Sequence, residues 1–379
     1  MGLYRRNRRG SPVRPRVFET NDFVDCPTGS ATDREPLIAR IREECGDKAA
    51  AFFQMHLPVK ADRISLLSTI EPAGVDSVAA DRQAVLVLER ANNARRINKY
   101  FRSVNARLNI GGLFLGCAEV NGQRRDRFLR KYPSPVAHMA YLFDFVLHRI
   151  CPKIPYVTPA YFAVTKGRDR PIARSEALGR LISCGFEVVE YREIDGLMYF
   201  AVRKVRESEA VQAPTYGPFC RLNRVGIGGE FFTVYKFRTM HPYSEFLQEY
   251  LYDKHNLQDG GKFLNDFRIT PWGKWMRRLW LDELPMILNL FKGELKLVGV
   301  RPLSRQYYGL YPDELKNLRN RHMPGLVPPF YVDLPKSFDE IVASEMNYLR
   351  AYEKAPFRTD VKYLFVALWN IFVKRARSA

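Results

Sequence analysis

The stretch Leu281-Asp282-Glu283-Leu284-Pro285 places two carboxylates just before a proline, and the C-terminal half of the chain is organised around it. Pro285 suits the first turn of a helix, where its missing N–H costs no hydrogen bond, and Gly293 suits the end of that helix. We therefore predict that Asp282 and Glu283 lie at a helix N-terminus. Backbone N–H groups and the helix dipole favour negative charge at that position.

Basic residues flank the acidic pair. A basic amphipathic segment, 268–278, runs into it, and a strand-like segment, 295–300, leads away from it to Arg301. Convergence of Arg277, Arg278 and Arg301 on the pair predicts an ionised aspartate among cations that hold a phosphate, as in phosphoryl transfer. Acidic residues in a first helical turn are also ordinary capping residues, so the spacing alone fits a purely structural role as well.

Four sequence blocks resemble the bacterial sugar transferase family, the monotopic polyprenyl-phosphate phosphoglycosyl transferases. In chain order these blocks are Gly217-Pro218 with Asn223-Arg224-Val225-Gly226; Val234-Tyr235-Lys236-Phe237-Arg238-Thr239-Met240; Arg268-Ile269-Thr270 with Gly273, Arg277 and the acidic stretch; and Asn289-Leu290-Phe291-Lys292-Gly293 with Leu297-Val298-Gly299-Val300-Arg301-Pro302-Leu303. The resemblance covers Gly217 to Pro324 and is looser from there to the C-terminus. It implies an α+β, mostly helical sugar-transferase domain.

The resemblance implies a reaction. A sugar-1-phosphate passes from a UDP-sugar to polyprenyl (undecaprenyl) phosphate through a covalent aspartyl-phosphosugar, which initiates exopolysaccharide, O-antigen or other glycoconjugate synthesis. Asp282 matches the nucleophile and Glu283 matches its partner, which helps to hold Mg²⁺ or assists proton movement; both are the implied Mg²⁺ ligands. Cations are needed because two phosphates and a carboxylate repel one another. The implied phosphate-binding residues are Lys236, Arg238, Arg268, Arg277 and Arg301.

The chain departs from the family before Gly217, where the family has a long apolar segment that enters the bilayer. Tyr141–Leu147 resembles the phrase that opens this segment, but His148 and Arg149 follow it. No run reaches the roughly 18 apolar residues of a spanning helix. We therefore expect peripheral or monotopic contact with the cytoplasmic face of the bacterial inner membrane.

A second departure surrounds Pro324-Gly325. Met323 stands where the family commonly has a basic residue, and Pro328–Asp333 replaces a Trp-Ala-Gln phrase. We expect Arg319 or Arg321 to supply the missing charge.

Composition indicates an anionic partner, because the 379 residues carry a net charge of +19. There is no zinc-finger spacing, helix-turn-helix signature or RNA-binding aromatic motif, so we expect an anionic membrane surface and phosphorylated substrates, and no nucleic acid. Tyr363–Val373, followed by Lys374, Arg375 and Arg377, suits an interfacial helix; a helix packed on the domain core is the alternative. The cysteines form no Cys-x-x-Cys pair and the histidines no cluster, which predicts free thiols and no metal site of that kind.

The length predicts two domains. We expect a basic flexible arm at 1–34, an α/β domain at 35–205, a linker at 206–216 and the sugar-transferase domain at 217–379.

The α/β prediction for 35–205 comes from alternating patterns. Predicted elements are a helix at 36–46, a strand at 84–89, a helix at about 92–108, a strand at 113–118, a helix at 176–183 capped by Ser175, and a hairpin of 186–194 and 197–205 around Asp195-Gly196. This order is similar to the second half of a class I methyltransferase, a partial Rossmann-like sheet. The likeness is carried by Leu108–Phe114 and Cys184–Val189.

The methyltransferase likeness lacks its binding signature. No Gly-x-Gly turn precedes Ala84, and such a turn is what brings the backbone close to S-adenosylmethionine. We expect a remnant with a structural or docking role. Two alternatives to a phosphoglycosyl transferase therefore stand: a catalytically idle membrane-surface scaffold of a glycan assembly system, and an S-adenosylmethionine-dependent methyltransferase.

Overall fold

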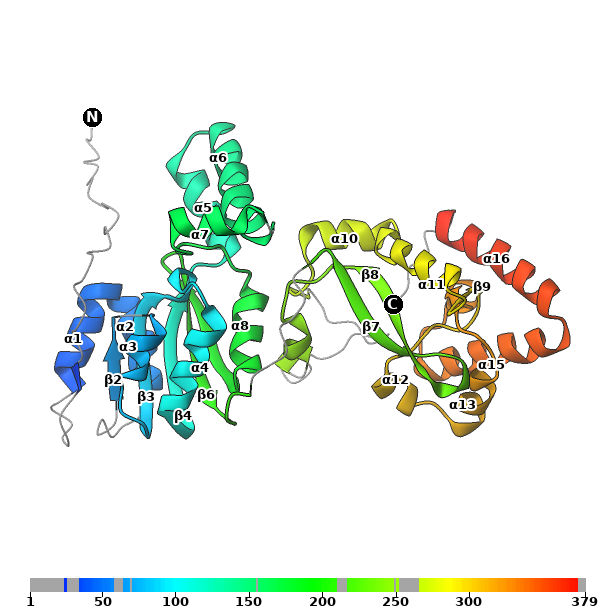
Figure 1. The fold of residues 1–379 in the computed structure, drawn as a ribbon, viewed down its shortest axis with the longest axis horizontal. Coiled ribbons are helices and arrows are strands. Elements are labelled where there is room, and N and C mark those ends of the chain that lie inside the picture. Colours follow the sequence, from blue (N-terminus) through cyan, green and yellow to red (C-terminus); the bar gives the residue numbers. More distant parts are fainter. Residues whose placement is uncertain are drawn as a thin grey trace, which may run out of the picture.

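The computed structural model describes residues 24–25, 34–57, 64–68, 70–154, 156–209, 217–248, 250–251 and 266–373. Most of the predicted basic arm at 1–34 and of the linker at 206–216 lies outside the described residues, as do Lys374, Arg375 and Arg377. Within the described residues, the N-terminal region is built on one sheet and the C-terminal region is mostly helical (Figure 1).

The N-terminal sheet has six strands in the order β1-β2-β3-β4-β6-β5. The strands are β1 (Val24–Asp25), β2 (Ile64–Leu67), β3 (Arg82–Arg90), β4 (Leu108–Ala118), β5 (Phe186–Ile194) and β6 (Leu197–Lys204). β2, β3 and β4 are parallel, whereas β6 is antiparallel to both β4 and β5. β3 is buried from Ala84 to Leu88, as expected of a parallel strand that is covered on both faces.

Helices cover both faces of this sheet. On one face α1 (Arg34–Cys45) and α2 (Asp47–His56) pack against β2, β3, β4 and β6. On the other face lie α3 (Pro72–Asp76), α4 (Ile97–Arg107) and α8 (Arg174–Ser183). The α/β prediction for this region is confirmed, while its Rossmann-like, methyltransferase-type assignment stays a prediction.

The predicted hairpin is present, and Asp195 and Gly196 both have positive φ, as a two-residue turn between twisted strands requires. Two local predictions were wrong. The helix expected from Asn92 is divided into a 3-10 turn, Ala91–Asn93, and α4. Ser175 does not cap its helix, because α8 begins at Arg174, two residues earlier than predicted, and Ala173 holds the cap position.

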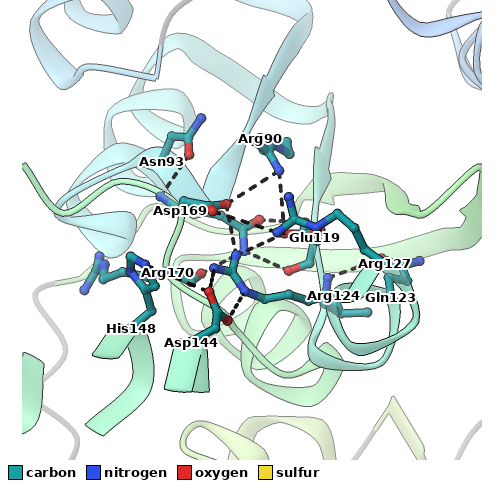
Figure 2. Close-up of polar contacts among 12 residues, drawn as sticks. Arg90, Asn93, Glu119, Gln123, Arg124, Arg127, Asp144, His148, Asp169 and Arg170 are labelled. Atoms are coloured by element: carbon teal, nitrogen blue, oxygen red, sulfur yellow. Dashed lines mark hydrogen bonds and ion pairs between the residues drawn. The ribbon is translucent and has the colours of Figure 1, made fainter. Parts of the chain in front are cut away.

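Three further helices project from the carboxyl edge of the sheet: α5 (Asn121–Lys131), α6 (Val136–Phe145) and α7 (Thr158–Thr165) (Figure 1). The π-helical turn Val146–Ile150 and the 3-10 turn Cys151–Lys153 connect α6 to α7. Buried Arg124 on α5 anchors this group (Figure 2). Its Nη1 lies 3.1 Å from Glu119 Oε2 at the end of β4, and its Nε and Nη2 donate to both oxygens of Asp144 on α6, at 2.7 and 2.6 Å.

Asp169 completes the network of Figure 2, with Oδ1 3.0 Å from Arg124 Nη1 and 3.6 Å from Arg90 Nη1. Asp169 has a positive φ of +53°, and its backbone N–H donates to Asn93 Oδ1. Charged groups from β3, β4, α5, α6 and this loop thus neutralise one another in a buried site. Partners of this kind fix the orientation of α5 and α6, because breaking such a network leaves a buried charge uncompensated.

The described part of the C-terminal region contains two small sheets. β7 (Phe219–Val225) and β8 (Phe231–Phe237) form an antiparallel hairpin, and β9 (Lys296–Val298) pairs in parallel with β10 (Gly325–Val327). The helical elements are α10 (Pro271–Arg278), the 3-10 helix η7 (Leu281–Met286), α11 (Ile287–Phe291), α12 (Arg305–Gly309), α13 (Asp313–Asn320), α14 (Phe330–Asp333), α15 (Phe338–Lys354) and α16 (Pro356–Phe372). The predicted α+β, mostly helical character is confirmed.

The two regions share a packed junction. A Cβ on Gly179 of α8 would lie only 2.2 Å from the carbonyl oxygen of Tyr243, which shows how closely the C-terminal chain approaches this helix. Leu247 and Leu251 are fully buried in the core on the α4 and α8 face of the N-terminal sheet. Side chains beyond the predicted linker therefore contribute to the first core.

Candidate active site

The end of β8 and the start of α10 are held together by Thr239 and Thr270. Thr270 caps α10 by accepting the Gly273 N–H, and both its own N–H and its hydroxyl donate to the Thr239 carbonyl, at 2.9 and 3.0 Å. Only glycine fits at 273, because a Cβ there would lie 2.1 Å from that carbonyl oxygen. This contact fixes α10 over the hairpin and brings Arg277 Nε to 2.9 Å from Thr239 Oγ1.

Trp280 turns the chain from α10 into η7. It has φ +63°, a left-handed conformation that costs energy for a large side chain. Its indole N–H donates to the Tyr331 hydroxyl at 2.9 Å, and the two rings pack edge to face. These contacts hold the turn from which the acidic pair follows.

Asp282 and Glu283 lie in the first turn of η7, so the predicted helix N-terminus is confirmed, but its geometry differs from the prediction. The first turns are 3-10, Pro285 lies inside them, and the α-helix α11 begins only at Ile287. Gly293 follows α11 with φ +71°, as expected of a helix end.

Asn289 joins α11 to the hairpin. This fully buried amide donates to the Thr233 carbonyl at 2.6 Å and accepts the Tyr235 N–H at 3.2 Å. The contact aligns β8 with η7 and places Lys236 beside the acidic pair. Lys236 Nζ lies 2.5 Å from Glu283 Oε1, and Arg301 Nη2 lies 4.0 Å from the same oxygen.

Asp282 stands next to this ion pair. Burial raises the pKa of its carboxyl, and Glu283 raises it further, while Lys236 and Arg277 lower it. The net direction is upward, so the ionised form is less favoured here than in a solvent-exposed aspartate. Among the described residues, no cation lies within ion-pair distance of the Asp282 carboxylate, although Lys236 and Arg277 act on it electrostatically.

The structure therefore brings together Lys236, Arg277 and Arg301 around Asp282 and Glu283. Arg268 and Arg238 are placed differently. Arg268 is buried, and its guanidinium forms a two-pronged pair with Asp266, at 2.9 and 2.7 Å. Arg238 Nε donates to the Gly217 carbonyl at 3.0 Å, at the entrance to β7.

Sequence reasoning missed three side chains of the site. Thr239 positions Arg277, and the thiol of Cys220 lies opposite Lys236 in the hairpin register. Burial lowers the pKa of Arg224, and the nearby charge of Arg301 lowers it further, so these two arginines repel each other. Thr239 and Arg224 belong to the sequence blocks that resemble the sugar transferase family, so the blocks could have identified both residues. Cys220 carried no such signal.

Arg319 has a different role from the one expected. It is buried and paired with Glu345, and its Nη2 donates to the Arg301 carbonyl at 2.6 Å. The charge of Arg319 is therefore neutralised by Glu345 in the interior, and its guanidinium holds the backbone of Arg301. Arg321 is exposed and lies 3.8 Å from Glu353.

Close backbone packing also positions Arg301. Gly299 and Gly325 lie back to back in the β9–β10 pair, and a Cβ on Gly325 would lie 2.0 Å from the Gly299 nitrogen. The close approach of the two backbones thus explains why the Pro324-Gly325 motif has glycine at its second position. Arg301 leaves β9 two residues after this contact.

Mg²⁺ is commonly held by one or two carboxylates together with substrate phosphates. Within the described part of the chain, no group of three or more His, Cys, Asp or Glu side chains is arranged to hold a metal ion. Asp282 and Glu283 are adjacent carboxylates, and the pKa of Asp282 is raised first by burial and then by Glu283, so a cation bound beside it would favour its ionised form. This donor set fits Mg²⁺ bound jointly with phosphate.

Exposed apolar side chains lie on the helices next to the site. We call them the apolar rim: Trp272 and Trp275 from α10, Leu279 directly after α10, and Leu288 and Phe291 from α11. Trp275 is 58% exposed and Phe291 is 84% exposed. The Trp272 ring packs edge to face with Phe145 of α6, so α6 adjoins the rim.

α6 and α16 also expose apolar side chains. Phe143 of α6 is 70% exposed. On α16, Ala367 and Asn370 are buried against the core while Phe365 and Trp369 are exposed. One face of 363–373 therefore packs on the domain core, while the interfacial role of the other face stays a prediction. None of the helices in the described ranges combines the length and the apolar character needed to cross a bilayer.

Comparison with known proteins agrees with the site. Residues 205–374 match the model of the family described as Bacterial sugar transferase. The chain is 34% identical over 151 residues to "Galactosyl transferase CpsE" of Streptococcus agalactiae, covering 38% of this chain and 32% of that protein.

Two further relatives are undecaprenyl-phosphate enzymes by name. The chain is 35% identical over 152 residues to a UDP-glucose:undecaprenyl-phosphate glucose-1-phosphate transferase of Xanthomonas campestris, covering 38% of this chain and 30% of that protein. It is 39% identical over 97 residues to an undecaprenyl-phosphate galactose phosphotransferase of Salmonella typhimurium, covering 24% and 20%. The chain thus spans about a third or less of the length of these relatives.

Comparison with solved structures carries no argument about the N-terminal region. A 16S rRNA (adenine(1408)-N(1))-methyltransferase from Catenulisporales acidiphilia aligns with a TM-score of 0.21 at 15% identity, covering 48% of this chain and 84% of that one. An exported-protein structure from Bordetella parapertussis aligns with a TM-score of 0.22 at 11% identity, covering 35% and 42%. Both scores are too low to assign a fold.

Proposed function

We propose that this chain is a phosphoglycosyl transferase that moves a sugar-1-phosphate from a UDP-sugar to polyprenyl (undecaprenyl) phosphate and so initiates the synthesis of an exopolysaccharide, O-antigen or related glycoconjugate. The observation that carries the proposal is the half-buried Asp282 beside Glu283, with Lys236, Arg277 and Arg301 around the pair. The family match of 205–374 and the names of the relatives support it.

The first step uses Asp282 as the nucleophile. A carboxylate oxygen attacks the β-phosphorus of the UDP-sugar, the bond from that phosphorus to the bridging oxygen breaks, and UMP leaves with the electron pair. In the second step an oxygen of polyprenyl phosphate attacks the phosphorus of the aspartyl-phosphosugar. The Asp282 carboxylate leaves, and a polyprenyl-diphospho-sugar is released.

The surrounding residues offset the charge that these steps bring together. Arg277 and Arg301 offer planar guanidinium groups, which match phosphate oxygens in pairs, and Lys236 offers a compact charge. Glu283 holds Lys236 in place by their ion pair. Mg²⁺, held by Asp282 and Glu283 with the donor phosphates, would neutralise phosphate charge when bound.

The proposed acceptor is a lipid, and the apolar rim supports contact with a membrane. Aromatic side chains with adjacent cations suit the boundary between headgroups and acyl chains. Lys274 and Arg278 are exposed on α10 between the apolar residues of the rim. We infer a peripheral or monotopic association with the cytoplasmic face of the bacterial inner membrane.

A single-turnover experiment tests the chemistry. The chain is incubated with a panel of radiolabelled UDP-sugars and Mg²⁺ without polyprenyl phosphate, and intact-protein mass spectrometry follows the phosphosugar adduct while UMP release is counted. We expect both with the wild type and neither with Asp282→Asn. Asp313→Asn, which changes a 92% exposed aspartate at the start of α13, is the matched control and retains both.

The proposal is contradicted if the wild type forms no adduct and releases no UMP with any sugar of the panel, whether polyprenyl phosphate is present or absent. The chain would then act as an idle scaffold at the membrane surface. An adduct that persists in Asp282→Asn would assign the nucleophile to another residue.

A further inference from the structure

A large basic cavity lies at the junction of the two regions, apart from the acidic pair. Its volume is about 840 Å³, and it is lined by α4, the π-helical turn after α6, α8, the entrance to β7 at Gly217-Pro218, and Tyr243. Seven of its lining side chains are cationic, whereas two, Glu176 and Glu209, are anionic. A cavity of this size accommodates a small molecule of nucleotide dimensions.

The floor of the cavity is a buried triad. Glu176 Oε2 lies 2.6 Å from Arg149 Nη2, and Glu176 Oε1 lies 2.7 Å from Arg180 Nη2. Burial opposes ionisation of this carboxyl, but the two arginines hold the pKa of Glu176 well below its ordinary value. One carboxylate therefore balances two guanidinium groups, both about nine-tenths buried, and a positive charge remains.

Both arginines are fixed before any ligand arrives. Arg149 Nη1 donates to the Pro171 carbonyl at 2.9 Å, and Arg180 Nη1 donates to Asn98 Oδ1 at 2.6 Å. The Arg180 guanidinium also lies 4.5 Å from the centre of the Tyr243 ring. Groups held in this way lose little entropy on binding an anion, which favours affinity.

The wall of the cavity adds more positive charge. Arg95, Arg96, Lys99 and Arg102 all line it from the start of α4. In the part of the chain that the structure describes, no carboxylate lies within ion-pair distance of Arg96 or Lys99. The N-cap residue of α4 makes no side-chain hydrogen bond to the first turn. The backbone N–H groups of that turn and the helix dipole therefore add to the positive potential of this wall of the cavity.

We propose that this cavity binds a small molecule with two or more phosphate groups, of the nucleoside-diphosphate class, between the buried guanidinium groups of Arg149 and Arg180 and the basic start of α4. Cations on two walls require negative charges that are spread over the ligand, which a single carboxylate or phosphate does not provide. Because Gly217 and Pro218 line the cavity and also accept hydrogen bonds from Arg238, the ligand would contact both regions of the chain.

Titration calorimetry with the full chain at physiological ionic strength tests the proposal, with inorganic triphosphate, ADP and inorganic phosphate as probes and no UDP-sugar. We expect triphosphate and ADP to bind with one equivalent per chain and inorganic phosphate to bind much more weakly. Arg96→Glu/Lys99→Glu should weaken triphosphate binding by about tenfold or more, because two attractive charges become repulsive. These side chains are exposed, and an unchanged thermal midpoint verifies the fold of the variant.

Two controls separate this cavity from the proposed active site. Arg125→Glu/Lys131→Glu makes the same change of net charge on α5, outside the cavity, and should leave binding unchanged. Arg277→Ala/Arg301→Ala alters the phosphate-binding residues near Asp282 and should also leave it unchanged. The milder Arg96→Gln/Lys99→Gln should give an intermediate loss and serves if the reversal variant unfolds.

The proposal is overturned if the wild type binds neither probe at about 1 mM. It is also overturned if binding survives the cavity variants, or is lost in the Arg277→Ala/Arg301→Ala variant. None of these outcomes depends on turnover of a UDP-sugar, so the inference stands or falls independently of the proposed transferase activity.

Discussion

Lys236 and Glu283, 47 residues apart in the sequence, form a largely buried ion pair of 2.5 Å, and Asp282 stands beside the pair without belonging to it. The two adjacent carboxylates, Asp282 and Glu283, therefore have different roles. Glu283 holds a cation in place, whereas Asp282 remains next to that cation with a raised pKa. A nucleophile needs an unshared carboxylate oxygen, and this division provides one.

The first prediction concerns this ion pair. Lys236→Met leaves Glu283 largely buried without its ammonium partner, which should lower the free energy of unfolding by about 1–3 kcal/mol. Lys236→Met/Glu283→Gln should recover part of that loss, giving a coupling energy of about 0.5–3 kcal/mol in a double-mutant cycle. Urea denaturation of the four proteins measures both quantities.

Lys292→Met is the control for this cycle, because Lys292 contacts the Tyr235 hydroxyl at the surface and no carboxylate of the pair. It should change stability little. Additive single mutants would show that Lys236 and Glu283 are not coupled.

The second prediction separates activity from stability at Asp282. Asp282→Asn should lower kcat by about a thousandfold or more, as removal of a nucleophile does. Its thermal midpoint at pH 7 should equal or exceed that of the wild type. The folded-state pKa is raised, so the folded protein holds this proton more tightly, and stability falls as pH rises through the window above the ordinary aspartate value; asparagine removes that loss.

Differential scanning calorimetry at pH 7 and a UMP-release assay check this pair of outcomes. A strongly destabilised Asp282→Asn would show that the carboxylate is structural.

The third prediction is a pH profile. The acidic limb of kcat/KM should lie above the ordinary aspartate pKa of 3.8, because burial and Glu283 disfavour the ionised Asp282 that attacks phosphorus. Glu283→Gln removes the neighbouring negative charge and should move the limb to lower pH. Lys236→Met removes a cation that lowers the pKa of Asp282 and should move it to higher pH.

Initial rates from pH 4 to pH 8 at constant ionic strength measure this profile. Shifts of the same sign in both variants would contradict the assignment of the limb to Asp282.

The fourth prediction concerns the membrane. Trp275→Ser/Phe291→Ser should weaken sedimentation with vesicles of anionic phospholipid by about tenfold or more, because each aromatic ring removed from lipid costs roughly 1–3 kcal/mol. Met55→Ser/Ile110→Ser removes two other exposed apolar side chains, from the N-terminal region, and should leave sedimentation unchanged. Equal losses in both variants would show that the apolar rim has no special role.

The fifth prediction concerns the backbone contact behind Arg301. Gly325→Ala places a methyl group against the Gly299 backbone and should destabilise the fold by about 1–3 kcal/mol or more, with loss of activity as Arg301 shifts. Gly309→Ala meets nothing within 4 Å and should be neutral in both assays. A Gly325→Ala variant as stable as the wild type would contradict the close packing.

Several features followed from the sequence because they depend on neighbouring residues. The buried strand at 84–88, the hairpin turn at Asp195-Gly196 and the helix end at Gly293 each rest on local patterns of apolar residues or on backbone conformations that glycine adopts easily. The basic flank of the acidic pair was likewise visible in the sequence. The resemblance to the sugar transferase family also followed from the sequence, because it rests on the order and spacing of motifs along the chain.

The tertiary structure alone decided which cations meet the acidic pair. Five basic residues matched the family equally well in the sequence, yet Arg268 is paired with Asp266 and Arg238 donates to the Gly217 carbonyl. Arg319, which was expected to supply a missing charge, instead pairs with Glu345 and donates to the Arg301 carbonyl. The α-helix expected at Asp282 is instead a 3-10 turn, and tertiary contacts of Trp280 and Asn289 hold the chain on both sides of it. The basic cavity likewise joins residues from 95 to 243, a convergence that only packing determines, since charge in a sequence does not specify which charges become neighbours.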